Sequence, residues 1–178
     1  MEREHRLQYE IRPPTLDDVV AIRSMHAQSW LDTYPNDEHG VSREWVEEET
    51  ASWLTSEKLD ESKECMAKIF ADPRHFYRIA LGDGEVVGMV HLSETEDGSK
   101  RLEALYTAKG THGTGLAQHL MEAGEAFLGH SDVVLEVVSY NQRAKAFYRK
   151  YGFEEMGENE LFKGKLPNVT MVRRREEE

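Results

Sequence analysis

The stretch HGTGLAQHLM, His112–Met121, places small residues at three alternate positions just before a run with helical character. These residues are Gly113, Gly115 and Ala117. Flexible residues at the start of a helix cost conformational order, so we expect them where another group must approach the backbone closely. Phosphate is the usual group, because the free N–H groups and the dipole of a helix N-terminus attract anions. The stretch therefore predicts a phosphate-binding loop.

The segments on either side of this loop predict a βαβ-like unit. Lys100–Thr107 and Val133–Val138 have the composition of strands, and the loop opens a helix between them. One face of that helix is predicted to carry Leu116, Leu120, Ala123 and Phe127. The loop then lies at the carboxyl end of a strand, where α/β sheets tend to bind ligands.

The rest of the chain alternates between helical and strand periodicity. Three helices precede an antiparallel pair of strands joined by the turn Gly82–Asp83–Gly84, and a helix and two strands close the chain. We expect one domain over residues 1–178, with a mixed, mostly antiparallel α/β sheet flanked by helices. The further predicted segments are strands at Tyr9–Arg12, Phe76–Leu81, Val86–Glu94, Phe153–Phe162 and Val169–Arg173, helices at Leu16–Leu31, from Ser42, Ser56–Phe70 and Gln142–Tyr151, and a solvated tail at Arg173–Glu178.

Composition limits the classes of protein to which the chain can belong. Its 178 residues are 39% hydrophobic and 31% charged, which is ordinary for a soluble globular protein. The net charge of −12 argues against nucleic-acid binding, which needs a basic face. Solubility is the simplest explanation of this charge, which is also compatible with attraction of a cationic substrate. The histidines show no spacing typical of metal ligands, so no metal is predicted.

The same survey predicts a cytoplasmic protein. No apolar run approaches the ~20 residues of a membrane span. The charged N-terminus, residues 1–12, lacks the apolar region of a signal peptide. Cys65 is the single cysteine, so no internal disulfide can form.

Two common phosphate loops fail the test of spacing. A Walker A loop needs Lys and then Ser or Thr directly after its last glycine, but Leu116 and Ala117 follow Gly115. A dinucleotide fingerprint needs a third small residue at the position of Gln118. The loop therefore belongs to neither class.

A third pattern fits. The loop Gln/Arg-x-x-Gly-x-Gly/Ala of the GNAT superfamily of acetyltransferases resembles His112–Ala117, although His112 replaces the Gln or Arg. Leu105–Thr107 resembles the Leu-Tyr-Val that ends the family's fourth strand. The stretch LEVVSYNQRAKAFYRKYGF, Leu135–Phe153, resembles a second family pattern in register, at Asn141, Ala144, Phe147, Tyr148, Gly152 and Phe153.

The resemblance implies acetyl-CoA as the cosubstrate and makes a homodimer the expected assembly. Backbone amides from Gly113 to Gln118 would cradle the pyrophosphate. In the family the fourth and fifth strands splay apart and pantetheine lies between them, here between Lys100–Thr107 and Val133–Val138. The residues assigned to coenzyme A on this basis are Leu105, Tyr106, Thr107, His112, Gly113, Thr114, Gly115, Leu116, Ala117, Gln118 and Asn141.

Two helix residues have competing interpretations. Tyr148 matches the family tyrosine that protonates the departing thiolate, and a phenol stays protonated at neutral pH, as that role requires. The alternative is an aromatic residue that packs on Phe147 and the sheet. Asn141 resembles the family residue that contacts the pantetheine or the substrate, and its alternative role is a helix cap.

The base that deprotonates the acceptor amine has three candidates. Glu136 is the sole carboxylate in the apolar run Val133–Val138, where burial raises the pKa of an acid, and it matches the glutamate used as base in ribosomal-protein acetyltransferases of this superfamily. Glu103, on the preceding strand, is the second candidate. A chain of water molecules is the third.

The acceptor pocket is expected from the N-terminal segment. SWLDTYP, Ser29–Pro35, resembles an element of polyamine acetyltransferase-like members, in which Trp30 and Tyr34 would form an aromatic wall for an alkyl ammonium. Trp30 is equally well explained as a core residue.

The leading hypothesis is acetyl transfer from acetyl-CoA to a small cationic amine or polyamine in a ternary complex, with no nucleic-acid or membrane partner. The alternatives are acetylation of a protein N-terminus or lysine, and a non-catalytic acyl-CoA-binding sensor.

Overall fold

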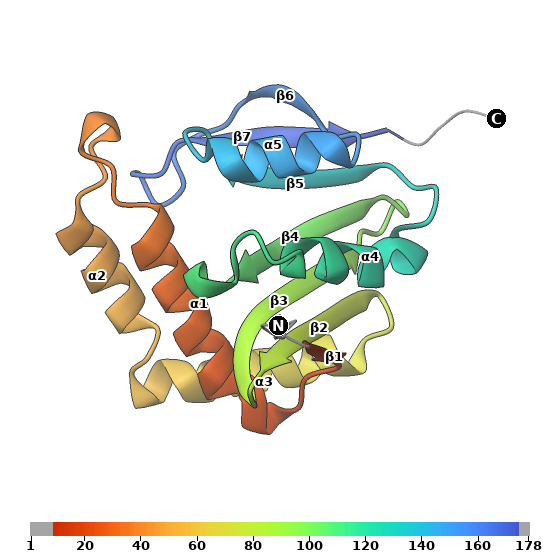
Figure 1. Cartoon of the computed structure of the whole chain (residues 1–178), viewed down its shortest axis with the longest axis horizontal. Helices are drawn as coiled ribbons and strands as arrows, with labels where there is room; N and C mark the ends of the chain where they lie inside the picture. The colour runs from red at the N-terminus through yellow and green to blue at the C-terminus, as the bar shows by residue number, and fades with distance from the viewer. Residues whose placement is uncertain (1–8, 175–178) are drawn as a thin grey trace, which may run out of the picture.

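The computed structural model describes residues 9–174, which form a seven-stranded sheet with helices on both faces (Figure 1). The strand order is β1-β2-β3-β4-β5-β7-β6, and all neighbouring pairs are antiparallel except β4 and β5. This confirms the predicted mixed, mostly antiparallel α/β sheet. The strands are β1 (Glu10–Arg12), β2 (His75–Gly82), β3 (Glu85–Glu94), β4 (Lys100–Thr107), β5 (Val133–Val138), β6 (Glu154–Glu158) and β7 (Asn168–Arg173). The helices are α1 (Val19–Thr33), α2 (Arg43–Ser52), α3 (Ser56–Ala71), α4 (Leu116–Leu128) and α5 (Gln142–Lys150), with 3-10 turns η1 (Leu16–Asp18), η2 (Asp37–His39) and η3 (Lys109–Thr111).

Apolar layers on the two faces of the sheet hold these helices. On one face α4 packs through Leu116 and Leu120, and α5 packs through Tyr148. On the other face α1 packs on β2 and β3 through Ile22 and Met25. Burial of each large aliphatic side chain contributes roughly 1.5–3 kcal/mol, so these layers supply most of the stability of the fold.

Turn chemistry sets the register of the antiparallel strands. Asp83 and Gly84 join β2 to β3, and their φ angles of 53° and 84° are the positive pair that a two-residue type I′ hairpin needs.

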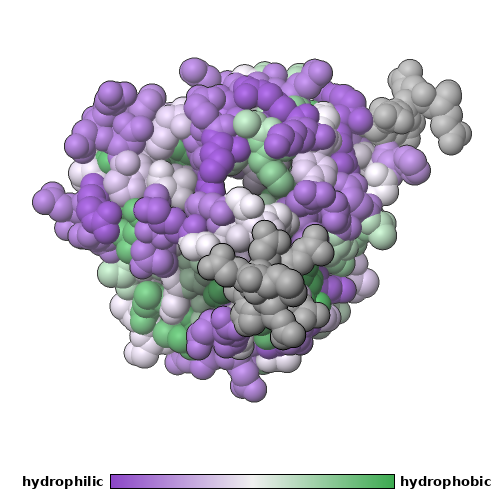
Figure 2. Space-filling model, in the orientation of Figure 1, coloured by the Kyte–Doolittle hydropathy of each residue, from purple (hydrophilic) through white to green (hydrophobic). Residues whose placement is uncertain are grey.

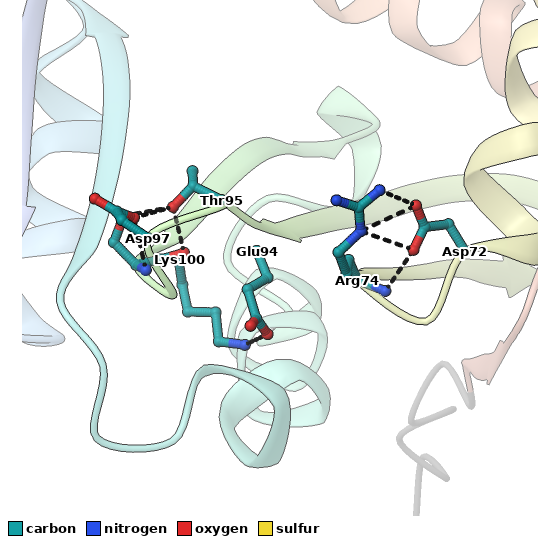
Figure 3. A network of polar contacts seen from close by, with 7 residues as sticks. Asp72, Arg74, Glu94, Thr95, Asp97 and Lys100 are labelled. Carbon is teal, nitrogen blue, oxygen red and sulfur yellow. Dashed lines mark hydrogen bonds and ion pairs between the residues drawn. The ribbon is translucent and has the colours of Figure 1, made fainter.

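Asp72 and Arg74 form an ion pair in the connection between α3 and β2 (Figure 3). That interaction lowers the pKa of Asp72 from its ordinary value to about 2.

The strands β4 and β5 diverge soon after they meet. Only Lys100–Leu102 of β4 pair with β5, at Val133–Leu135, although both strands continue beyond these pairs. A register shift against β3 also places a bulge in β4 at Glu103. Figure 1 shows the two ribbons separating, and the functional site is built around this divergence.

The entry to the first helix differs from the prediction. The segment begins as the 3-10 turn η1 and becomes α-helical only at Val19. Asp18 accepts hydrogen bonds from the guanidinium of Arg12 and from the backbone N–H of Thr15, which holds this entry tight. Thr15 and Asp18 therefore bond each other at the start of this segment.

Two further predictions near the C-terminal half are wrong. Ala123 of α4 is exposed and Gly124 is buried, because a Cβ on Gly124 would lie 2.5 Å from Leu92 Cδ1 and only glycine allows this close approach to β3. The strand predicted to reach Phe162 ends at Glu158, and Phe162 lies in the β6–β7 loop.

The described chain ends directly after β7. Arg173, predicted to start a solvated tail, is the last residue of β7 and forms an ion pair with Glu125 of α4. The rest of that predicted tail from residue 175, and the charged N-terminus up to residue 8, lie outside the described residues. Among the helices that the structure describes, none has the length and apolarity needed to span a bilayer.

Candidate active site

A cavity of about 970 Å³ occupies the space where β4 and β5 diverge. Its walls include β4 from Leu102 to Thr107, β5 from Glu136 to Val138, the start of α4, and one side of α5. The surface is visibly hollowed between the levels of α5 and α4 in Figure 2. The cavity therefore joins the predicted phosphate loop to the predicted acceptor elements.

The loop before α4 lines one part of this cavity, which we call the loop end (Gly113, Gly115, Leu116, Ala117 and Gln118). Gly113 and Gly115 have φ angles of 81° and 86°, a left-handed conformation that side chains other than glycine disfavour. Gly115 is the N-cap of α4 and supplies no side-chain cap. The first N–H groups of α4 are thus available to an anionic ligand.

Neighbouring side chains support the loop and adjust its charge. The hydroxyl of Thr114 donates a hydrogen bond to the carbonyl of Thr111 at 2.7 Å and also bonds the hydroxyl of Tyr9. These two bonds stabilise the conformation of the loop. His112 is exposed at the cavity rim, and desolvation followed by the charge of Arg143 lowers its pKa. His112 therefore offers a neutral contact near pH 7, whereas Arg143 and Lys150 bring positive charge to the cavity wall.

The strand β4 offers backbone groups to a bound chain. Leu105, Tyr106 and Thr107 line the cavity and lie beyond the last residue of β4 that pairs with β5. On their other side these residues pair with β3. An extended ligand in the gap could therefore bond the open edge of β4 as a strand would.

Tyr148 extends from α5 into the buried wall of the cavity. Burial, and to a lesser extent Tyr106, raises the pKa of its phenol well above the ordinary value. No group within residues 9–174 hydrogen-bonds its hydroxyl. The structure thus places a protonated, unengaged O–H beside the cavity, although the ring also packs near Phe147 and Phe153.

Asn141 lines the cavity but its side-chain oxygen is already engaged. It accepts a hydrogen bond from the backbone N–H of Ala144 at 3.2 Å and so caps α5. This oxygen therefore acts as a helix cap, which is the alternative role that the sequence offered for Asn141. The cap in turn fixes the start of the helix that carries Tyr148.

The two candidate carboxylates come from the two diverging strands, and both line the cavity. The expectation that Glu136 is buried within its strand is wrong. Its neighbours along β5 are buried, but Glu136 lies on the opposite face, is exposed, and accepts a hydrogen bond from Asn159 Nδ2 at 3.2 Å. Glu103 stands at the β4 bulge, where Ser93 Oγ donates to it at 2.6 Å.

An aromatic cluster (His26, Trp30, Tyr34, Tyr106 and Phe162) lines the other end of the cavity, which we call the aromatic end. Trp30 Nε1 donates to His26 Nε2 at 3.1 Å and to the Tyr106 hydroxyl at 3.3 Å. The hydroxyls of Tyr34 and Tyr106 lie 3.3 Å apart. Trp30 and Tyr34 are buried core residues that also line the cavity, and their contact with an alkyl ammonium group stays a prediction.

Sequence reasoning missed two members of this cluster. His26 stands four residues before Trp30, a helical spacing that indicates a shared face. Burial lowers its pKa to about 3, so the imidazole is neutral at physiological pH. Phe162 reaches Trp30 from the β6–β7 loop with 6.0 Å between ring centroids, and no local pattern in the sequence indicates this contact.

Comparison with known proteins places these features in a family. A model described as the acetyltransferase (GNAT) family matches residues 25–153. Two proteins described as uncharacterised N-acetyltransferases, from Mycobacterium bovis and Mycobacterium tuberculosis, are 40% identical over 94 residues, which cover 51% of this chain and 60% of each relative. The match thus spans less than two thirds of the length of these curated relatives.

A solved structure shares the fold over nearly the whole chain. The PaiA N-acetyltransferase from Thermoplasma acidophilum, determined in complex with coenzyme A, aligns with a TM-score of 0.70 and 20% identity, covering 94% of this chain and 99% of that one. Because the family match spans well over half of the chain, this chain belongs to the acetyltransferase (GNAT) family.

Proposed function

We propose that this protein transfers the acetyl group of acetyl-CoA to the primary amine of a small cationic amine or polyamine, directly within a ternary complex. One observation carries the proposal. A single cavity at the divergence of β4 and β5 is lined by free amides at a helix N-terminus, by the unengaged hydroxyl of Tyr148, and by an aromatic cluster. Acetyl donor and acceptor can therefore occupy one cavity together.

The residues of the loop end fit coenzyme A. The uncapped N-terminus of α4 suits a pyrophosphate, and Arg143 and Lys150 suit further phosphate charge. The open edge of β4 at Leu105–Thr107 suits the amides of a pantetheine arm. The coenzyme A complex of the Thermoplasma acidophilum relative supports this choice of cosubstrate.

The chemical steps need a base for the acceptor amine and an acid for the leaving thiolate. Acetyl-CoA supplies an acetyl thioester, which the acceptor amine attacks as coenzyme A leaves. Glu136, Glu103 or a bound water takes the proton that the amine loses. Tyr148 donates a proton to the leaving sulfur, and burial keeps this phenol protonated until then. Tyr148 also favours an enzyme over a non-catalytic sensor.

A turnover screen with acetyl-CoA tests the proposal. The acceptor panel contains polyamines, alkylamines, lysine peptides and peptides with free N-termini, and the products are identified by mass. Acetylated polyamine or alkylamine as the main product is expected. Preference for peptides would favour the protein-acetylating alternative, and coenzyme A binding without turnover of any acceptor would favour the sensor.

The pH profile of kcat/KM identifies the base. The rate is expected to rise with pH because free alkyl amines have pKa values near ~10 and must be neutral to attack. It falls only where Tyr148 ionises, and because burial raises that pKa, the falling limb lies above pH 10.0. Glu136→Gln should weaken the rising limb if Glu136 is the base, with Glu103→Gln as the matched variant. Two unchanged profiles would assign proton removal to water.

Ionic strength tests the expected acceptor charge. With a net charge of −12, we expect kcat/KM for a cationic amine to fall several-fold as salt rises, because attraction over ~8–10 Å is screened at physiological salt. An aniline-type acceptor, which is uncharged at neutral pH, is the matched control and should show little change. Neutral or acidic acceptors that outperform every polyamine and peptide would refute the charge argument.

The homodimer and the cytoplasmic location stay predictions. Light scattering of the purified protein tests the homodimer.

A further inference from the structure

His26 of α1 lines the aromatic end of the cavity with one of its two ring nitrogens already engaged. Its Nε2 atom accepts the indole N–H of Trp30 at 3.1 Å. Because an indole nitrogen can only donate, this bond fixes the tautomer of the imidazole, and the ring proton lies on Nδ1. Burial, followed by the charge of Arg23, lowers the pKa of His26 to about 3, so the ring is neutral near pH 7 and carries that single N–H.

The Nδ1–H group of His26 has no acceptor within the described part of the chain. Nδ1 makes no hydrogen bond among residues 9–174, and the buried side-chain atoms without a partner there are Nε of Arg23 and Oδ1 of Asn168. Nδ1 of His26 is therefore not a buried atom, and a molecule in the cavity that His26 lines can reach it. A free and reachable donor in a cavity wall suits a ligand that brings an acceptor.

The tyrosines beside His26 leave one more donor unused. The hydroxyls of Tyr34 and Tyr106 lie 3.3 Å apart, and only one of their two hydrogens can lie between them. The other polar groups of this cluster bring donors and no free acceptor, since Trp30 donates to Tyr106 and Tyr140 donates to the carbonyl of Tyr34. The aromatic end thus holds two unused donors, which match the two lone pairs of a carbonyl oxygen.

The charges near His26 favour an oxygen over a second ammonium group. Arg23 lies one helical turn before His26, and its guanidinium is 4.8 Å from the centroid of the Trp53 ring. No carboxylate among residues 9–174 pairs with Arg23, so its charge acts on His26 uncompensated. Lys163 and Glu49 pair with each other beside this cluster, and their charges offset one another. The positive charge of Arg23 repels an ammonium group and attracts the negative end of a carbonyl dipole.

We propose that His26 is a specificity-determining residue whose Nδ1–H donates a hydrogen bond to a carbonyl oxygen of the acceptor amine. The inference rests on the proposed function and narrows its substrate class to primary amines that carry an amide carbonyl group away from the reacting nitrogen. Such an acceptor has one ammonium group and one neutral oxygen. The preference arises in binding, because the carbonyl group stays distant from the acetyl group.

The test compares straight-chain amino amides of increasing length with the n-alkylamine and the diamine of the same chain length. The parent protein should favour the best amino amide over both by roughly five- to a hundredfold in kcat/KM, mostly through KM, because an alkyl or ammonium end leaves the N–H of His26 unpaired. A parent that prefers the diamine, or that does not distinguish the three amines, would overturn the inference and leave acetyl transfer to a cationic amine intact.

Three substitutions of His26 separate contact with the acceptor from support of the aromatic cluster. His26→Phe keeps an aromatic ring without nitrogen and should bring the preference for amino amides close to one. His26→Asn keeps an N–H donor as many bonds from the backbone as Nδ1, so it should retain most of the preference. His26→Gln places its amide at the position of Nε2, where it can accept the indole N–H of Trp30, but it has no donor at Nδ1 and should lose the preference. The reverse order of the Asn and Gln variants, or an equal loss for amino amide and n-alkylamine in all three, would overturn the proposal.

Thermal stability identifies a purely structural role of His26. The bond from Trp30 can form in His26→Gln but not in His26→Asn, so the Tm of the Gln variant should be the higher of the two. The preference for amino amides is expected to follow the opposite order. A preference that follows Tm across the variants would assign His26 to the fold and overturn the proposal.

A binding measurement keeps the inference testable if no amine is acetylated. Amino amides, n-alkylamines and diamines are titrated by calorimetry onto the protein saturated with coenzyme A. Tighter binding of the amino amide by the parent and by His26→Asn, lost in His26→Phe, supports the role of His26 and places the failure in the proposed chemistry. Equal binding of the three amine classes by the parent would overturn the inference itself.

Discussion

Tyr148→Phe is expected to lower kcat by roughly 10²–10⁴-fold while the Kd for acetyl-CoA stays unchanged. The substitution removes a hydroxyl and keeps the ring that packs with Phe147 and Phe153. That hydroxyl bonds no group within residues 9–174, so its loss leaves no described partner unpaired. Steady-state kinetics with the best acceptor, and a calorimetric titration with acetyl-CoA, measure the two quantities separately.

Tyr77→Phe is the matched control for this experiment. Tyr77 is also a buried tyrosine with a raised pKa, but its hydroxyl donates to Met89 Sδ, and the residue does not line the cavity. We expect its kcat to stay close to that of the parent, with any effect limited to Tm. Activity of Tyr148→Phe within a factor of two of the parent would reduce Tyr148 to a packing residue.

Gly115→Val is expected to raise the Kd for coenzyme A by on the order of ten- to a thousandfold. Gly115 holds φ at 86°, a region that a β-branched side chain disfavours, so the loop must change its backbone to accept valine. The change reorients the amides that would hold the pyrophosphate. A Cβ at this position meets no other atom within 4 Å, so packing itself tolerates the substitution.

Gly129→Val at the opposite end of α4 supplies the control. Gly129 also has a positive φ, 53°, and open space around its Cβ, but it does not line the cavity. Both variants should lose stability through backbone strain, roughly 1–3 kcal/mol. Only Gly115→Val should lose affinity for coenzyme A. Equal affinity of the two variants would exclude the loop as the binding site.

Local patterns in the sequence determined most of the elements that carry the site. The bounds predicted for β4 and β5, Lys100–Thr107 and Val133–Val138, agree with the structure residue for residue. The start of α4 at Leu116 follows from glycines that neither a helix interior nor a strand favours. These features depend on periodicity, turn chemistry and backbone preference over a few neighbouring residues, so the chain itself displays them.

Tertiary structure alone decided how the side chains of the site are buried and paired. Glu136 lies in an apolar run, yet the partner strand and Asn159 leave it on an exposed face. Phe162 contacts Trp30 across more than a hundred residues of sequence, from the β6–β7 loop to α1. Burial and hydrogen-bond partners depend on which segments distant in sequence come together, and no local pattern records that.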